Sequence, residues 1–415
     1  IPIAHEDESK YKQLEIDYVL DKFKPLLESK SIKKLGHNLK YDRNVLLNYD
    51  ITLNAIEHDS MLLSYVYDPT VIRHGLDNVA EKYLSYKTIH YEDVAGKGVK
   101  QIPFAKVDID VAAEYACEDS LVSYELYNYL WEKISKNKSI VNIYKDIEMP
   151  LVPVLSNIEK NGVLIDSTQL NNLSKELEES LQDIQKKCFK LTKKEFNLNS
   201  PKQLQEILYK DLEIPITKKT PTGKPSTDED TLQFLAQSHK LPALILDYRS
   251  LNKLKTGYTD KLPLLVCKKS GRIHTSYQQA ITATGRLSST EPNLQNIPIK
   301  SSQGRKIRNA FIAEPGKKIF AADYSQIELR IMAHLSNDSN LLKTFNNNID
   351  VHSFTASEIF NIDLNEVSSE NRRAAKAINF GLIYGMSSFG LSKQLGISIP
   401  DAKDYMDIYF KRYPE

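Results

Sequence analysis

The stretch Glu370-Asn-Arg-Arg-Ala-Ala-Lys-Ala-Ile-Asn-Phe-Gly-Leu-Ile-Tyr-Gly385 decides how the C-terminal part of the chain folds. Four large side chains recur in it every four residues: Arg372, Lys376, Phe380 and Tyr384. At about 100° per residue, they share one face of an α-helix. Two cations followed by two flat rings suit a ligand with an anionic end and a planar end, such as a nucleoside triphosphate. The same spacing is equally consistent with an ordinary amphipathic helix that buries its rings and exposes its cations.

Length and composition restrict the class of protein. The 415 residues are enough for about two or three domains. Three widely separated cysteines without a CxxC pair indicate a reducing compartment and no metal knot. The mean hydropathy of −0.42 and the lack of a long apolar run predict no membrane span, and Ile1-Pro-Ile-Ala-His5 does not resemble a signal peptide.

The net charge is only +1, but the charges are unevenly distributed. Residues 186–224 hold ten Lys and four acidic residues, and residues 249–308 hold twelve Lys or Arg and two acidic residues. These segments therefore carry +6 and +10 in an otherwise acidic chain. The second is interleaved with Tyr258, Tyr277 and many polar residues of the types that contact phosphates and bases. This pattern favours a polyanion bound along one surface, although a charge run is also typical of a solvated face.

Residues 1–135 have a mixed α/β pattern. A strand and turn are expected over 32–39, and helices from about Tyr41, over 76–84 and over 111–130. Asp42 and Asp119 are candidate ligands for two divalent ions that hydrolyse a phosphodiester, with Tyr115 one helical turn before Asp119 to orient water. Each aspartate alone is also typical of a surface or capping position.

The next segment, 144–261, is charged and has helical periodicity. Asp166 is expected to cap a long helix that ends near Leu191, and Pro201 is expected in the first turn of another. A basic loop with two prolines and a glycine follows over 217–227. Long helices with a cationic tip could grip a duplex backbone, but a helical linker with a solvated loop fits equally well.

After Lys261 the sequence predicts a strand from Ile273, followed by a glycine-containing loop that presents Arg286. Three amide side chains then lie between two prolines and suit a nucleic-acid groove: Asn293, Gln295 and Asn296.

Further along, residues 317–322 are expected to form a short strand that ends in Asp323, a favourable place for a divalent ion beside a helix N-terminus. Ser325 and Glu328 have the spacing of a capping box at the start of that helix. The helix is expected to bury Ile327, Ile331 and Leu335.

Three of these runs together closely resemble family A DNA polymerases: Thr284-Gly-Arg-Leu-Ser-Ser289, Asp323-Tyr-Ser-Gln-Ile-Glu-Leu-Arg330 and Arg372 to Gly385. The last two resemble that family's motifs A and B. Asn38-Leu-Lys-Tyr-Asp42 and Tyr115-Ala-Cys-Glu-Asp119 resemble the second and third motifs of its 3′–5′ exonuclease domain. The resemblance covers essentially the whole chain.

The resemblance implies an α/β multidomain fold. A ribonuclease-H-like 3′–5′ exonuclease domain, a mixed sheet with helices, is expected over 1–135. A helical thumb over 136–260, the N-terminal part of a palm over 261–335 and truncated fingers over 336–415 would form part of the right-hand polymerase fold, without the C-terminal part of the palm.

The resemblance also implies roles for single residues. Asp323, with the Tyr324 carbonyl, would bind the catalytic metal ions, while Asp42 and Asp119, with Tyr115, would serve proofreading. The incoming nucleotide would meet Gln326, Glu328, His352, Arg372, Lys376, Phe380 and Tyr384, with Glu328 excluding the ribose 2′-hydroxyl and Arg372 and Lys376 also assisting catalysis. Primer-template DNA would meet Lys253, Arg286, Asn293, Gln295, Asn296 and Lys300.

The sequence departs from the family pattern in three places. The family's second polymerase carboxylate belongs to a His-Asp-Glu motif that does not occur before Glu415, and the first exonuclease motif, Asp-x-Glu, would precede Ile1. Lys300 stands where the family often has Arg, which keeps the charge and loses the bidentate fork. We therefore expect a piece of a longer polymerase.

The expected function is template-directed DNA synthesis from a primer, with 3′–5′ proofreading, in DNA replication and repair. The expected cofactor is Mg²⁺, two ions at each site, with Mn²⁺ as a substitute. The expected partners are primer-template DNA and deoxynucleoside triphosphates, with no membrane, for a monomer in the bacterial cytoplasm and nucleoid or inside a DNA-containing organelle (plastid, apicoplast or mitochondrion). The alternatives are a stand-alone 3′–5′ exonuclease and a non-catalytic duplex-binding fragment.

Overall fold

The computed structural model describes residues 1–6, 11–299 and 301–414. The chain divides into two compact units, Ile1–Ile319 and Phe320–Glu415, and each unit is described by itself. The described part of the chain is rich in helices and holds three two-stranded sheets.

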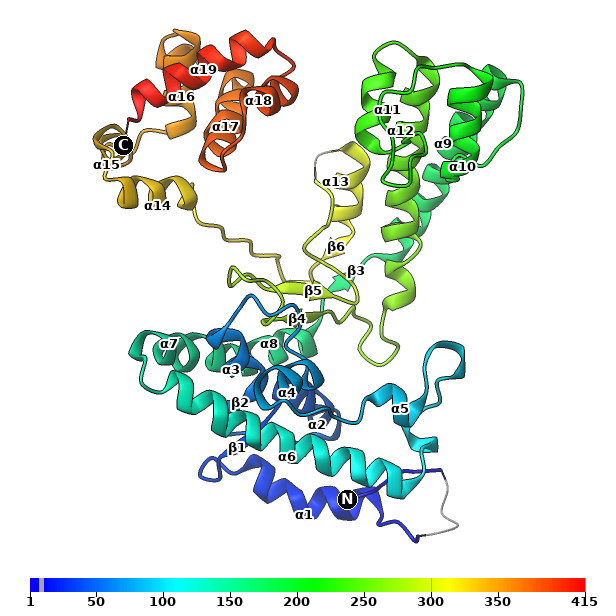
Figure 1. The fold of residues 1–415 in the computed structure, drawn as a ribbon, viewed down its shortest axis with the longest axis vertical. Coiled ribbons are helices and arrows are strands. Elements are labelled where there is room, and N and C mark those ends of the chain that lie inside the picture. Colours follow the sequence, from blue (N-terminus) through cyan, green and yellow to red (C-terminus); the bar gives the residue numbers. More distant parts are fainter. Residues whose placement is uncertain (7–10, 300, 415) are drawn as a thin grey trace. The chain divides into compact units, whose positions relative to one another are not determined.

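The N-terminal part of the first unit places helices around a short parallel sheet (Figure 1). Strand β1 (Lys34–Gly36) pairs with β2 (Ile56–Asp59). The helices are α1 (Ile16–Glu28), α2 (Leu39–Leu46), α3 (Ser60–Tyr67), α4 (Leu76–Leu84), α5 (Tyr91–Ala95) and α6 (Ile109–Ile134). The α6 helix packs on α3 and α4 around a buried cluster that includes Leu62, Val79, Leu126 and Leu130. The expected mixed α/β pattern is confirmed, including the helix over 76–84.

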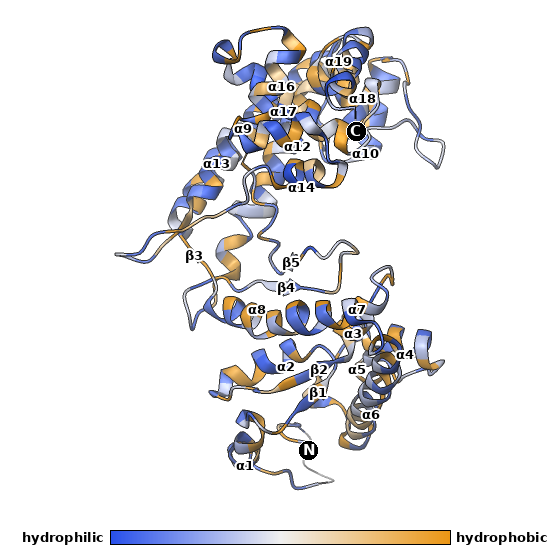
Figure 2. Cartoon of the chain, turned by 90° about the vertical axis from the view of Figure 1, so that its left-hand side faces the viewer, coloured by the Kyte–Doolittle hydropathy of each residue, from blue (hydrophilic) through white to orange (hydrophobic). Residues whose placement is uncertain are grey.

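A connecting segment follows α6 and leads to α8. It consists of α7 (Lys138–Asn142) and a wider helical turn (Ile143–Glu148), and α8 spans Met149–Asn161. Hydrophobic and hydrophilic residues alternate in bands along α8 (Figure 2), as expected for a helix with one packed face. The α8 helix packs against α2, β2 and β4, and it therefore joins the N-terminal part to the strands that follow.

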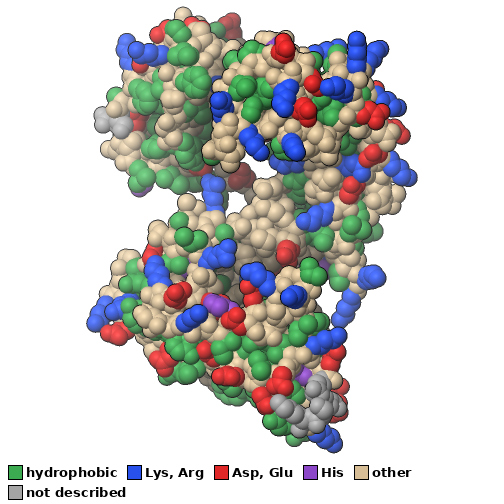
Figure 3. All heavy atoms as spheres, turned by 45° about the vertical axis from the view of Figure 1, so that its right-hand side comes forward, with side chains coloured by type: hydrophobic (Ala, Val, Ile, Leu, Met, Phe, Trp, Pro, Cys, Tyr) green, Lys and Arg blue, Asp and Glu red, His purple; other side chains and the backbone are tan. Residues whose placement is uncertain are grey.

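The helical segment that follows α8 contains α9 (Ser167–Thr192), α10 (Pro201–Glu206), α11 (Glu229–Ala236) and α12 (Lys240–Leu254). The Asp166 carboxylate caps α9 by accepting from the Gln169 N–H at 2.8 Å, and Pro201 opens α10, so both expected helix starts are confirmed. Lys and Arg side chains on this segment alternate with acidic ones (Figure 3). Several of the cations are in fact paired, as in Lys194–Asp211 and Lys218–Asp228.

Two antiparallel strand pairs complete the first unit. Strand β3 (Leu164–Ile165) pairs with β6 (Phe311–Ile312), and α13 (Ser302–Asn309) precedes β6. Strands β4 (Ser276–Gln278) and β5 (Ser288–Thr290) form a hairpin. Its connecting loop contains Gly285 at φ 79°, a left-handed conformation that suits glycine.

The second unit consists of helices around one core. They are α14 (Ile327–Ser336), α15 (Ser339–Asn346), α16 (Val351–Phe360), α17 (Ser369–Ile383), α18 (Ser388–Leu395) and α19 (Ile399–Arg412). Their buried residues include Leu329, Leu341, Ile378 and Leu391. The helix expected over 370–385 is confirmed as α17, which ends two residues earlier and begins with a reciprocal cap between Ser368 and Asn371.

Three local expectations for the stretch before and within α14 are wrong. Residues 317–322 form no strand, because none of the described strands lies beside them to supply hydrogen bonds. Ser325 is not the cap: Gln326, in a left-handed conformation, takes that position without a side-chain cap bond. Ile327, Ile331 and Leu335 are 39%, 50% and 74% exposed. The helix packs instead on its Leu329 and Ala333 side, which the sequence did not distinguish because apolar residues occur on both sides.

Candidate active sites

The α17 helix presents its cations outward and its aliphatic side inward. Arg372 and Lys376 are exposed and Phe380 is half-buried, whereas Ala375 and Ile378 are buried against the core. The Lys376 ammonium lies 5.9 Å from the centre of the Phe380 ring. Cations and ring therefore stand side by side on the accessible face, as a planar, anionic ligand requires.

Tyr384 stands where α17 ends, and its ring is 67% exposed. Its hydroxyl donates to Oε1 of Glu328, in the first turn of α14, at 2.8 Å. This bond joins two residues that are 56 positions apart in the sequence. It also removes the alternative in which both rings are buried in the core.

Asp350 connects three elements of the second unit. Its carboxylate accepts from Arg372 Nε at 3.1 Å and Nη2 at 2.8 Å, from Gln326 Nε2 at 2.8 Å, and from the Ser353 N–H at 2.8 Å. Burial alone would raise the pKa of Asp350, but the Arg372 guanidinium and the Ser353 N–H hold that pKa well below its usual range. Sequence reasoning missed Asp350, although its position before an apolar helical run, Val351–Phe360, is a recognisable capping signal.

His352 is buried, with 2% of its surface exposed, one residue into α16. Its Nδ1 is 3.0 Å from the Asn379 amide nitrogen, and its ring lies 5.6 Å from the Phe380 ring. Burial lowers the pKa of His352 to about 4, so the ring is neutral at pH 7. The buried His352 ring, on α16, therefore packs against the Phe380 ring from the core side and does not reach the exposed face of α17.

Asp323 and Tyr324 lie in the extended segment before α14, and both are exposed. A carboxylate and a backbone carbonyl are ligands that Mg²⁺ prefers. Within the described ranges, no group of three or more His, Cys, Asp or Glu side chains is arranged to hold a metal. The residues present therefore fit Mg²⁺ in ligand type and supply part of a coordination shell.

A second site lies in the first unit, where Asp42 and Asp119 line one cleft of about 430 Å³. We call it the exonuclease cleft; it is lined by residues of β1 and α2 (Leu35–Leu39, Tyr41, Asp42), by Leu76, and by one side of α6 (Asp119, Ser120, Ser123). Burial raises the pKa of both carboxyl groups, and the nearby Asp59 and Asp77 add to the shifts of Asp42 and Asp119 respectively. Carboxylates 77 positions apart are thus brought together, as a divalent-ion site requires.

Tyr115 lies one turn before Asp119 on α6. Burial raises the pKa of its hydroxyl, and the Asp119 carboxylate raises it further, so the hydroxyl keeps its proton and can donate. Asp59, which sequence reasoning missed, is buried and accepts from the N–H groups of Asn38 and Leu39 at 3.0 and 2.8 Å. It thereby fixes the start of the helix that carries Asp42.

The residues expected to contact DNA are exposed on the β4–β5 hairpin, on the loop after it and on α12. Arg286, Asn293, Gln295, Asn296 and Lys253 are all exposed. The Gln295 amide donates to the Leu287 carbonyl at 2.9 Å, which ties the later loop to the hairpin next to Arg286. Lys300 lies outside the described residues.

Comparison with known proteins identifies both parts of the chain. A model of the 3′–5′ exonuclease family matches residues 2–135, and a model of DNA polymerase family A matches residues 167–415. The chain is 52% identical over 417 residues to DNA polymerase I of Pseudomonas aeruginosa, which covers 100% of this chain and 46% of that protein. It is 39% identical over 396 residues to DNA polymerase I of Geobacillus stearothermophilus, covering 95% of this chain and 44% of that protein. The chain thus spans about half the length of these curated relatives.

Solved structures agree. The POL domain of Pol1 from M. smegmatis, in complex with DNA primer-template and dNTP, matches with a TM-score of 0.81 and 36% identity over 98% of this chain and 67% of that chain. The matched family segments, the two sites and this structural likeness together show that the chain belongs to DNA polymerase family A and carries a 3′–5′ exonuclease domain.

Proposed function

We propose that the complete protein is a DNA-directed DNA polymerase that extends a primer and removes mispaired ends with its 3′–5′ exonuclease. The observation that carries the proposal is the accessible face of α17. It presents Arg372 and Lys376 beside the Phe380 ring, and the hydroxyl of Tyr384 holds Glu328. The similarity to a polymerase domain solved with primer-template and dNTP supports the same assignment.

At the polymerase site, Arg372 and Lys376 bind the triphosphate and stabilise the negative charge that grows on it during transfer. Phe380 lies against the sugar and base, Tyr384 lies near the templating base, and Glu328 excludes a ribose 2′-hydroxyl. Gln326, bonded to the same Asp350 carboxylate as Arg372, keeps the start of α14 next to α17. His352 supports the Phe380 ring.

Asp323 and the Tyr324 carbonyl would hold Mg²⁺ at the polymerase site, and Asp42 and Asp119 would hold it in the exonuclease cleft. Two such ions per site would lower the pKa of the attacking hydroxyl or water and neutralise the leaving group, and Mn²⁺ would substitute for them. The raised pKa values of Asp42 and Asp119 suit a site that a divalent cation completes, because a cation favours the ionised carboxylates.

Arg286, Asn293, Gln295, Asn296 and Lys253 contact the primer-template duplex, with Lys300 beside them in the sequence. Minor-groove acceptors are shared by all base pairs, so Arg286 would report pairing geometry and not sequence.

The protein acts as a monomer in DNA replication and repair. Its named relatives are bacterial, which supports the bacterial cytoplasm and nucleoid over an organelle. None of the helices in the described part of the chain is long and apolar enough to cross a membrane.

Primer extension by the complete protein tests the proposal. Asp323→Ala should abolish incorporation while duplex binding and excision of single-stranded DNA persist, and Asp119→Ala should abolish excision while incorporation persists. A stand-alone exonuclease would excise but never extend, and a duplex-binding fragment would do neither. Full incorporation by Asp323→Ala would overturn the assignment of the polymerase site.

A further inference from the structure

A buried carboxylate is bonded to α2, on the side of that helix that faces away from the exonuclease cleft. Glu159, on α8, accepts from Lys40 Nζ at 2.6 Å and from Asn44 Nδ2 at 2.6 Å. The Lys40 and Glu159 side chains are only 7% and 6% exposed. At about 100° per residue, Lys40 and Asn44 lie on the opposite side of α2 from Asp42. Glu159 therefore binds one side of α2, and the opposite side of α2 lines the cleft.

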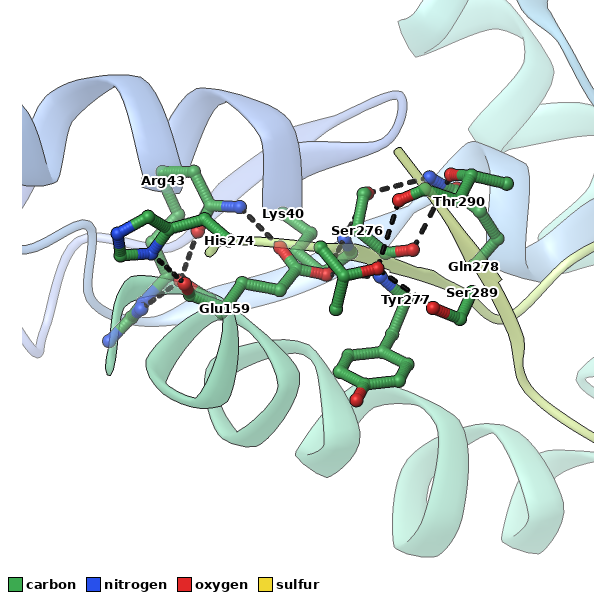
Figure 4. Close-up of polar contacts among 12 residues, drawn as sticks. Lys40, Arg43, Glu159, His274, Ser276, Tyr277, Gln278, Ser289 and Thr290 are labelled. Carbon is green, nitrogen blue, oxygen red and sulfur yellow. Dashed lines mark hydrogen bonds and ion pairs between the residues drawn. The ribbon is translucent and has the colours of Figure 1, made fainter. Parts of the chain in front are cut away.

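The same carboxylate also binds the β4–β5 hairpin. The Tyr277 N–H, in the middle of β4, donates to Glu159 Oε1 at 2.6 Å (Figure 4). In that view the Glu159 carboxylate lies close to Lys40 and to the strand that carries Ser276 and Tyr277. The backbone carbonyl of Glu159 is 2.7 Å from Nδ1 of His274, just before β4. One side chain is thus bonded both to the helix of Asp42 and to the hairpin whose loop presents Arg286.

Other contacts keep α2 folded and Asp42 in place independently of Glu159. Arg43 binds Ser156 and Asn157 on α8, the latter at 3.1 Å. The Asp59 carboxylate holds the first N–H groups of the helix, as described above. Neither set reaches β4. Lys40 Nζ also reaches β4 directly, with Ser276 Oγ at the longer distance of 3.5 Å. Glu159 adds the shorter contacts, at 2.6 Å to both Lys40 Nζ and the Tyr277 N–H, and a charged group in a buried setting makes such bonds strong.

We propose that Glu159 is a positioning residue that fixes the exonuclease cleft relative to the β4–β5 hairpin, so that a mispaired primer 3′ end passes from one to the other within a single DNA-binding event. The inference rests on the proposed function, since it needs extension and excision in one protein. A frayed primer end has a limited length. A hairpin that shifts relative to Asp42 therefore leaves the end misplaced, and the DNA dissociates before it reaches the cleft.

The test compares Glu159→Gln with Glu148→Gln in the complete protein. Glu148 is also buried and accepts from Gln279, one residue beyond β4, at 2.7 Å, so it contacts the hairpin side as Glu159 does. Among the residues that the structure describes, no hydrogen bond or ion pair joins Glu148 to α2, which makes it a matched control. Three rates are measured: excision of a single-stranded oligonucleotide, insertion on a matched primer, and excision of a mismatched end in one encounter, with excess unlabelled DNA as a trap.

Glu159→Gln should lower single-encounter excision of the mismatched end by about threefold to tenfold, a range typical of coupling between sites, and leave the other two rates within about twofold. Glu148→Gln should leave all three within about twofold. Because the Gln variant leaves Lys40 charged and buried without its partner, the double variant Lys40→Gln/Glu159→Gln removes that charge. It should fold like the parent and show the same selective loss.

The inference is overturned if a folded Glu159 variant excises the mismatched end in one encounter at the parent's rate. It is also overturned if all three rates fall equally, or if Glu148→Gln lowers single-encounter excision as much as Glu159→Gln does. These outcomes leave the proposed function intact, because the parent still extends and excises. A parent protein that excises no single-stranded DNA overturns both.

Discussion

Replacing Tyr384 with Phe removes the hydrogen bond from its hydroxyl to Glu328 in α14. The hydroxyl donates to Glu328 Oε1 at 2.8 Å, so the substitution removes the donor and leaves the ring. The ring is 67% exposed, and little packing is lost with the hydroxyl. The proposed task of Glu328 is to exclude a ribose 2′-hydroxyl. A carboxylate freed from Tyr384 should therefore exclude it less well, with small effects on insertion of the correct deoxynucleotide.

The structure sets the size of this effect. A hydrogen bond to a charged group contributes about 1.5–3 kcal/mol when buried. At an exposed position water competes, and about 0.5–1 kcal/mol is the appropriate range. Since about 1.4 kcal/mol corresponds to a factor of ten in rate, Tyr384→Phe should lower the discrimination between deoxynucleotide and ribonucleotide about twofold to fivefold. Glu328→Ala, which removes the carboxylate altogether, should lower it further.

Single-nucleotide insertion measures the effect, as the ratio of kcat/KM for a deoxynucleotide to that for the matching ribonucleotide. Tyr405→Phe is the matched control, because Tyr405 lies in α19 and its ring packs on Phe360. An unchanged ratio in Tyr384→Phe, or an equal fall in Tyr405→Phe, would refute the reasoning.

Three further predictions concern other contacts. Lys376→Ala should raise the KM for deoxynucleotides and slow insertion while DNA affinity stays within about twofold; a change confined to DNA affinity would contradict the phosphate-binding role. Asp350→Asn should lower stability by about 0.5–1 kcal/mol at neutral pH, because the folded-state pKa of Asp350 lies below its unfolded value and its ion pair stabilises the fold above about pH 4. That difference should shrink as the pH falls towards 3 in thermal unfolding, and a difference that grows on acidification would contradict the sign. Gly162→Ala should cost more than about 1 kcal/mol in urea unfolding, since φ is +61° and a Cβ would lie 2.6 Å from the Ile273 carbonyl oxygen. Gly223→Ala, at φ +79° with open space around it, should cost less, and equal losses would remove the steric explanation.

Periodicity located several elements because one strong local pattern determined each of them. The four-residue spacing from Arg372 to Tyr384 predicted α17, and the exposed Tyr384 ring shows that the stripe is not simply a core edge. The helix starts at Asp166 and Pro201 likewise depend only on adjacent residues. The motif resemblance identified the family, which no spacing argument had separated from its alternatives.

Predictions from local sequence patterns were wrong where the local structure depends on residues that are distant in the sequence. Residues 317–322 have the composition of a strand, but a strand needs a partner, and the described strands provide none there. Glu328 fits a capping box with Ser325, yet the left-handed Gln326 displaces the cap and Glu328 bonds to Tyr384. The domain boundaries and the roles of the individual site residues remain predictions.

By itself the sequence determined helices such as α9 and α17, the helix starts at Asp166 and Pro201, and the motifs that identify the family, because each is carried by residues close together in the chain. Only the tertiary structure decided which distant groups meet. It placed Asp42 and Asp119 in one cleft, Asp350 against Arg372, and Glu159 between α2 and β4. Such contacts depend on how helices pack, and packing is set by the whole core and not by any one segment.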